Sequence, residues 1–219
     1  MTATLDDDLD REEKIPLPEL EPKYFHAQAC SSLGYVFDEY DCVPIFSYGK
    51  SSVEQRRALF DESAPDSDDQ IDYSTLEPNH VYEAWIGRGD LIGMCHVTLT
   101  TIKYTEAIHF AFDLETIFIA PRHRKQGVAA VLCKTAARKE FDRIANFIMS
   151  LPDHRGTQYK FIVDSDVRNE GGIKMAQTFF DELSEMFFYL GQSQGFKVEC
   201  EEAFNDWVSP LQSKTETFS

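Results

Sequence analysis

Basic residues occupy four consecutive positions, 122–125, in a chain whose formal net charge is −17. They follow the apolar run "IFIA" at 117–120 and a proline, and they come just before Gly127. A strand that ends at a proline and continues through Arg-x-x-Gly-x-Ala into a helix presents free backbone N–H groups and the positive end of a helix dipole at one point. This segment therefore predicts a site for an anion, and a diphosphate is the ligand that suits it.

The side chains of this segment have different parts in such a site. Gly127 lets the backbone approach a phosphate without a Cβ atom in between, and Ala129 keeps the first helical turn slim. Arg122, Arg124 and Lys125 add positive charge at the rim. The predicted site is thus a set of backbone amides with a cationic border.

Hydrophobic periodicity predicts the elements that position this segment. Val81–Leu99 holds two strand-like runs about the turn "GRGD", which predicts a hairpin, and residues 109–120 predict a third strand. The other predicted elements are a strand near 43–48, a helix at 52–63, a helix from 126 to about 151, a strand at 159–166, a helix at 171–190 and a strand at 195–204. The order from Val81 onward is hairpin, strand, helix, strand, helix, strand.

The chain divides into one domain and two extensions. Residues 1–22 form an acidic arm, which we expect to be mobile or loosely docked because like charges repel and little apolar surface is offered. Residues 23–205 form the domain, best defined over 81–200, and residues 206–219 form a tail. Residues 64–80 predict an exposed polar loop.

Composition limits the partners and the compartment. An isoelectric point near 4.6 argues against binding to nucleic acid or an anionic membrane and favours a cationic partner. The five cysteines are odd in number and widely spaced, which predicts free thiols in a reducing compartment, and no run approaches the ~18 apolar residues that span a bilayer. We therefore expect a cytosolic protein. The six histidines show no ligand spacing and Arg168 interrupts the calcium-like run "DSDVRNEGG", so no metal is expected.

The stretch "IFIAPRHRKQGVAAVL" resembles the acetyl-CoA-binding motif of the GNAT N-acetyltransferase superfamily, in which a hydrophobic strand leads through Arg/Gln-x-x-Gly-x-Gly/Ala into a helix. Arg124, Gly127 and Ala129 stand at the three signature positions. "DVRNEGG", a helix and "QGF" resemble the family's second conserved block, so the resemblance covers just over half of the chain. It implies an α/β (α+β) GNAT fold: a mixed, mostly antiparallel sheet flanked by helices, open between the strands at Ile117 and Ile162.

The same resemblance assigns a coenzyme site. Backbone amides of the turn would hold the pyrophosphate, and the strand before it would pair with the pantetheine arm as an added strand pairs with a sheet edge. The turn residues are Gln126, Gly127, Val128 and Ala129, and the strand residues are Ile117, Phe118 and Ile119. Asn169 falls where the family often has an Asn that contacts the pantetheine; a helix N-terminal or turn residue is the alternative.

Carboxylates are the candidates for the base that an amine acceptor requires. Asp113 stands six residues before Ile119, where some members of the family carry a catalytic Glu, and Glu115 shares its strand face. Asp164 stands five residues before Asn169, where other members place an acid. Each could equally be a solvated or ion-paired carboxylate. The resemblance gives the oxyanion to a backbone N–H of the Ile117 strand.

The proton for the departing thiolate commonly comes from a Tyr four residues before the Gly-Phe pair of the family. That position is Gly191 here, and Tyr189 is the nearest substitute, two residues too early. Tyr189 either faces the cleft as a general acid or caps the helix at the surface.

The resemblance implies direct transfer of acetyl from acetyl-CoA to a primary amine in a ternary complex. The acceptor is expected to be cationic: a polyamine or antibiotic, a protein lysine or a protein N-terminus. The rival hypothesis is a non-catalytic module that keeps the core and uses its acidic arm to engage a basic partner protein. Sequence leaves the oligomeric state open, a dimer included.

Overall fold

The computed structural model describes residues 12–21, 23–25, 44–63, 80–87, 89–152, 154–165 and 169–204. Most of the predicted polar loop, the first eleven residues of the acidic arm and the C-terminal tail lie outside these ranges. No helix within the described ranges is long and apolar enough to cross a membrane.

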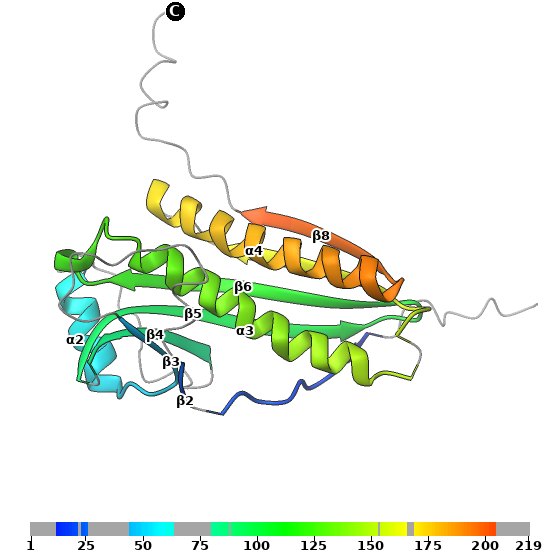
Figure 1. Cartoon of the computed structure of the whole chain (residues 1–219), viewed down its shortest axis with the longest axis horizontal. Helices are drawn as coiled ribbons and strands as arrows, with labels where there is room; N and C mark the ends of the chain where they lie inside the picture. The colour runs from blue at the N-terminus through cyan, green and yellow to red at the C-terminus, as the bar shows by residue number, and fades with distance from the viewer. Residues whose placement is uncertain are drawn as a thin grey trace, which may run out of the picture.

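Eight strands and three α-helices make up the described part of the chain (Figure 1). In chain order the elements are β1 (Glu13–Lys14), β2 (Lys23–Phe25), β3 (Ile45–Tyr48), α2 (Val53–Ser63), β4 (Val81–Ile86), β5 (Asp90–Lys103), β6 (Ala107–Ile119), the 3₁₀ turn η2 (Pro121–His123), α3 (Val128–Ser150), β7 (Gln158–Ser165), α4 (Glu170–Gln194) and β8 (Lys197–Phe204). Each helix and strand expected from the sequence is present, with ends that differ by a few residues.

The strands form one mixed sheet in the order β2-β3-β4-β5-β6-β7-β8, with β1 pairing separately with β5. The strand pairs β1–β5, β2–β3, β3–β4, β4–β5 and β5–β6 are antiparallel, whereas β6–β7 and β7–β8 are parallel. The described chain is therefore an α+β protein with a mixed, mostly antiparallel sheet, as expected at this coarser level.

Helices α3 and α4 cover the same face of the sheet (Figure 1). Each helix connects two parallel neighbours, and such crossovers are right-handed, so two successive crossovers in one direction place both helices on one side. Their apolar stripes pack on a core rich in aromatic rings, where Phe161 stacks on Phe187 of α4 with centroids 3.5 Å apart and Phe112 meets Phe179 at 5.8 Å. This core holds the parallel strands in register.

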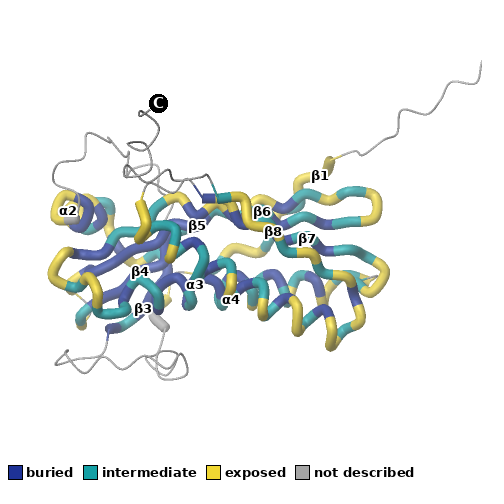
Figure 2. Tube along the Cα trace, turned by 90° about the horizontal axis from the view of Figure 1, so that it is seen from above, coloured by how far each residue is buried: buried dark blue, intermediate teal, exposed yellow. Residues whose placement is uncertain are grey.

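Helix α2 lies on the opposite face, at the end of the sheet where β6 terminates (Figure 2). A second apolar cluster joins it to the sheet, and Phe60 of α2 packs edge-on against Phe118 of β6 at 5.0 Å. The loop before α2 is held by Glu83 of β4, whose buried carboxylate accepts hydrogen bonds from the hydroxyls of Ser47 and Ser51 and from the backbone N–H groups of Lys50 and Ser51. The carboxylate thus replaces the water that these donors would otherwise bind.

Pairing between β6 and β7 ends before β6 does. The last paired residues are Asp113 and Asp164, and β6 continues to Ile119 with β5 as its described neighbour. Glu115 is an extra residue in β6, because the β5–β6 register passes from His96 opposite Thr116 to Val97 opposite Leu114. Such a bulge bends a strand and increases its local twist, so the sheet opens beside Glu115.

The second half of the acidic arm is docked. Glu13 and Lys14 pair with β5, Leu17 and Leu20 pack against the main core, and Nε of Arg143 donates to the carbonyl of Pro18 at 2.7 Å. For residues 12–21 the structure therefore shows docking, one of the two alternatives that composition allowed. The two leucines supply the apolar surface that binds this segment.

Candidate functional site

The segment between β6 and α3 leaves backbone donors unused. Lys125 has a φ of 63° and Gly127 a φ of 81°, both in the left-handed region, and Gly127 is the N-cap of α3 without a side-chain capping hydrogen bond. The first helical bond runs from Val131 N to Gly127 O at 3.1 Å, so the amides of the preceding turn remain available. The positive end of the α3 dipole and these N–H groups suit an anion.

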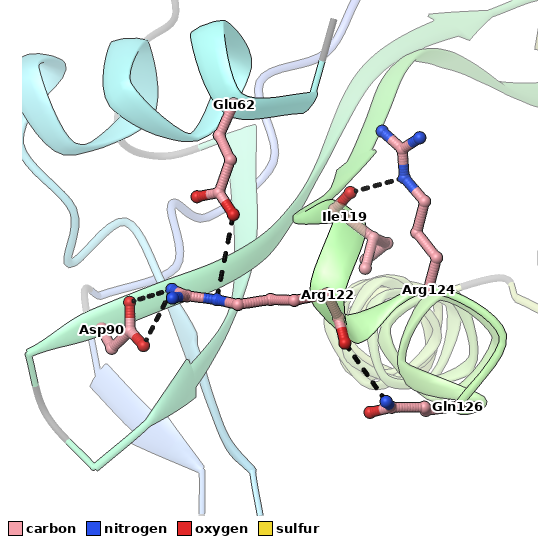
Figure 3. Close-up of polar contacts among 6 residues, drawn as sticks. All are labelled: Glu62, Asp90, Ile119, Arg122, Arg124 and Gln126. Atoms are coloured by element: carbon pink, nitrogen blue, oxygen red, sulfur yellow. Dashed lines mark hydrogen bonds and ion pairs between the residues drawn. The ribbon is translucent and has the colours of Figure 1, made fainter.

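The basic residues of this turn have distinct partners (Figure 3). Nη2 of Arg122 reaches both carboxylate oxygens of Asp90 at 3.1 Å, and its Nε lies 3.8 Å from Oε1 of Glu62 on α2. Nε of Arg124 donates to the carbonyl of Ile119 at 3.0 Å and so holds the end of β6. Gln126 donates through Nε2 to the carbonyl of Arg122 at 3.2 Å. The charge predicted for the rim is therefore partly committed to protein partners.

Replacing Asp90 by Asn should release Arg122 from its exposed ion pair. The coenzyme site expected from the sequence predicts that coenzyme A then binds about two- to fivefold more tightly at low salt, because a phosphate no longer competes with the carboxylate. Stability should fall by less than ~1 kcal/mol. Isothermal titration calorimetry at two salt concentrations measures the change, with Asp61→Asn on α2 as the control. Unaltered or weaker binding would show that Arg122 lies outside the anion's field.

The β6 edge offers main-chain groups next to these amides. Residues Ile117, Phe118 and Ile119 pair with Cys95, Met94 and Gly93 of β5 on one side. Their described pairing with β7 has already ended. The carbonyl of Ile119 accepts from Arg124, and the remaining groups that point to the other side are open to an added strand. Strand edge and helix N-terminus are only a few residues apart.

Three of the four candidate acids and bases meet at this opening. Asp113 and Asp164 are in register on neighbouring strands at the last β6–β7 pair, and both are exposed. Glu115 follows in the bulge, where its Oε2 lies 2.7 Å from Nδ1 of His96. The opening is therefore bordered by carboxylates on the face opposite α3 and α4.

Asn169 and Tyr189 have other places in the structure than the three carboxylates at the opening between β6 and β7. Asn169 is the N-cap of α4, and its Oδ1 accepts a hydrogen bond from the N–H of Gly172 at 2.9 Å, which confirms the capping alternative. Tyr189 is 60% exposed and lies twenty residues further along α4, about 30 Å at the helical rise. Because α4 runs back toward the start of β8 beside Gln158, Tyr189 lies near the far end of the sheet.

His96 is the residue that sequence reasoning missed. Metal-ligand spacing assigns it no role, whereas His96 is a buried polar residue that interrupts the apolar run 91–97 of β5. Burial lowers the pKa of His96 below its usual value, and Glu115 opposes that shift. A polar side chain inside an apolar strand was the available signal, but its partner on β6 was not visible in the sequence.

Comparison with known proteins adds no identification. No protein-family model matches the chain, and no curated protein matches it in sequence. Among the described residues, no group of three or more His, Cys, Asp or Glu side chains is arranged to hold a metal ion.

Proposed function

We propose that the protein is an N-acetyltransferase of the GNAT type, which transfers acetyl from acetyl-CoA to a primary amine in a ternary complex. The observation that carries the proposal is the juxtaposition of an open β6 edge at 117–119 with the uncapped N-terminus of α3 at Gly127. A ligand with an extended arm that ends in a diphosphate needs both features: the strand edge pairs with the arm, and the helix N-terminus binds the negative charge.

Different residues of the chain bind the diphosphate, hold the strand for the arm and stabilise the oxyanion. Amides of Gln126, Gly127, Val128 and Ala129 bind the diphosphate, and Arg124 keeps the end of β6 in place for the arm. Gly127 has a φ of 81°, a backbone conformation that L side chains rarely adopt, and without a Cβ atom its backbone stays accessible to a phosphate. The thioester then lies near Glu115 and Ile117, and a backbone N–H of that strand stabilises the oxyanion.

The acceptor in this proposal is a cationic amine that approaches from the α2 face. Carboxylates of Asp113, Glu115 and Asp164 surround the opening and attract it, in agreement with the net charge of −17. The departing thiolate takes its proton from solvent, since Tyr189 lies about 30 Å along α4 from Asn169. We also propose a cytosolic location, which suits the free thiols of Cys95, Cys133 and Cys200.

The position of Tyr189 also favours a second candidate, a coenzyme-binding module without turnover that engages a basic partner protein. The acidic arm of residues 1–22, docked over 12–21, would supply the contact surface in that case. The two candidates share the coenzyme site and differ in chemistry.

Free thiol release from acetyl-CoA separates the candidates. The full-length protein is mixed with acetyl-CoA and spermidine, kanamycin, a lysine peptide or a peptide with a free N-terminus, and coenzyme binding is measured by calorimetry. We expect binding and amine-dependent thiol release. Binding without turnover on any amine would favour the module, and absence of binding would refute both.

A further inference from the structure

His96 and Glu115 form a polar pair that coenzyme binding does not use. Nδ1 of His96 lies 2.7 Å from Oε2 of Glu115, and the two side chains are 5% and 38% exposed. Both ring nitrogens of His96 are buried without a hydrogen bond of regular geometry within the described part of the chain, so the contact of Nδ1 with Glu115 is an ion-pair distance and Nε2 has no hydrogen-bond partner. Buried polar atoms almost always have a partner, so an orphaned one marks strain, catalysis or bound solvent.

The pair stands at the opening of the sheet. Glu115 is the bulged residue of β6, two positions after the last pair with β7 and two before Ile117. A bulge re-aims the side chain that it carries, here onto the ring of His96 on the neighbouring strand. The β-bulge in β6 therefore both opens the sheet and directs the side chain of Glu115 toward His96.

The charged and titratable groups around His96 come from three elements. Glu115 faces it from β6, Arg56 from α2, and His80, just before β4, has its ring centroid 6.0 Å away. Burial is the largest effect and lowers the pKa of His96; Glu115 raises it, and His80 and Arg56 lower it further. The ring is thus neutral at neutral pH, and a carboxylate at Nδ1 selects the tautomer with hydrogen on that nitrogen. The lone pair then resides on Nε2.

We propose that His96 is the proton acceptor of the acetyl transfer and that Glu115 is its positioning residue. This role rests on the proposed function. The ammonium of the acceptor gives one proton to Nε2, directly or through one water, and its nitrogen forms the bond to the acetyl carbon. The carbon–sulfur bond breaks and the electron pair leaves with the thiolate. The nitrogen loses its second proton to solvent, from which the thiolate takes one, and the imidazolium keeps the negative Glu115 beside Nδ1.

Two variants and their matched controls test the role in the full-length protein. His96→Asn keeps a donor near Nδ1 but cannot take the proton, and Glu115→Gln keeps the shape of Glu115 without its charge. His109→Asn, at the far end of β6, and Glu106→Gln, in the exposed turn before β6, are the controls. Readouts are coenzyme A binding, kcat/KM against pH with the best amine of the panel, and the His96 ring titration by NMR.

We expect His96→Asn to lose about 100-fold in kcat/KM, together with the acidic limb of the pH profile, while coenzyme binding stays within twofold. Glu115→Gln should move that limb and the His96 titration to lower pH, because the carboxylate raises the pKa of His96. Wild-type profiles in both variants would overturn the role of the pair and leave the proposed function standing. If His96→Asn does not fold, Glu115→Gln decides alone: an unmoved His96 titration and an unmoved acidic limb overturn the role of the pair. If the wild-type protein shows no turnover, the proposed acetyltransferase function itself is refuted, and the role of the pair with it.

Discussion

Replacing Gly127 by Leu should weaken coenzyme A binding by at least about 100-fold. In the proposed site the α3 amides bind phosphate, which requires that the anion approach the backbone, and a branched side chain at the N-cap fills that approach. Gly127 has a φ of 81°, so the change should also cost ~1–2 kcal/mol in unfolding free energy. Calorimetric titration with coenzyme A and urea unfolding measure the two effects separately.

Gly195→Leu is the matched control for this backbone strain. Gly195 ends α4 with a φ of 78° and has open space where a Cβ would be placed. The control should therefore lose similar stability and keep its affinity for coenzyme A. If Gly127→Leu binds coenzyme A as tightly as this control does, the phosphate site lies elsewhere.

Replacing Glu83 by Gln should lower the free energy of unfolding by about 3–5 kcal/mol, the loss typical of breaking a buried charged network. Its carboxylate accepts from two hydroxyls and two backbone N–H groups and also balances the buried guanidinium of Arg56. An amide replaces one acceptor by a donor that faces other donors. The urea midpoint should fall with an unchanged slope, which would report lost stability rather than a different unfolded state.

The effect should extend from stability to the site. Glu83 holds the loop before α2, and α2 carries both Phe60 against Phe118 and Arg56 near His96. We therefore expect a lower kcat/KM together with the loss of stability. Glu202→Gln on the exposed edge strand β8 is the control and should stay within about 0.5 kcal/mol. Similar stability in the two variants would show that the donors around Glu83 find other acceptors.

Element types and their order were predictable because they depend on local periodicity. Alternation along 109–119 and three- and four-residue spacing in α3 and α4 are properties of neighbouring residues. The mixed sheet follows from the same order, since helices between strands bring the strands parallel and tight turns bring them antiparallel. The turn at Gly127 was predictable for a similar reason, because a positive φ beside a helix start has few sequence solutions.

Pair contacts across the sheet were not predictable from the chain alone. The sequence predicts Arg122 at the rim of a phosphate site, and the structure adds its ion pairs with Asp90 and Glu62, which come from the hairpin and from α2. Tyr189 was assigned by its distance from a Gly-Phe pair, but its place relative to the opening depends on how far α4 runs back along the sheet. Both depend on the packing of distant segments.

The sequence by itself determined the α+β order of elements, the basic turn after β6 and the strand that carries Asp113, Glu115 and Ile117. Only the tertiary structure decided where β6 parts from β7 and that the bulge turns Glu115 onto His96. The physical reason is the range of the interactions. Backbone preferences and amphipathic periods act over a few residues, whereas a bulge, its register and the burial of His96 exist only once two strands have paired and α2 has covered them.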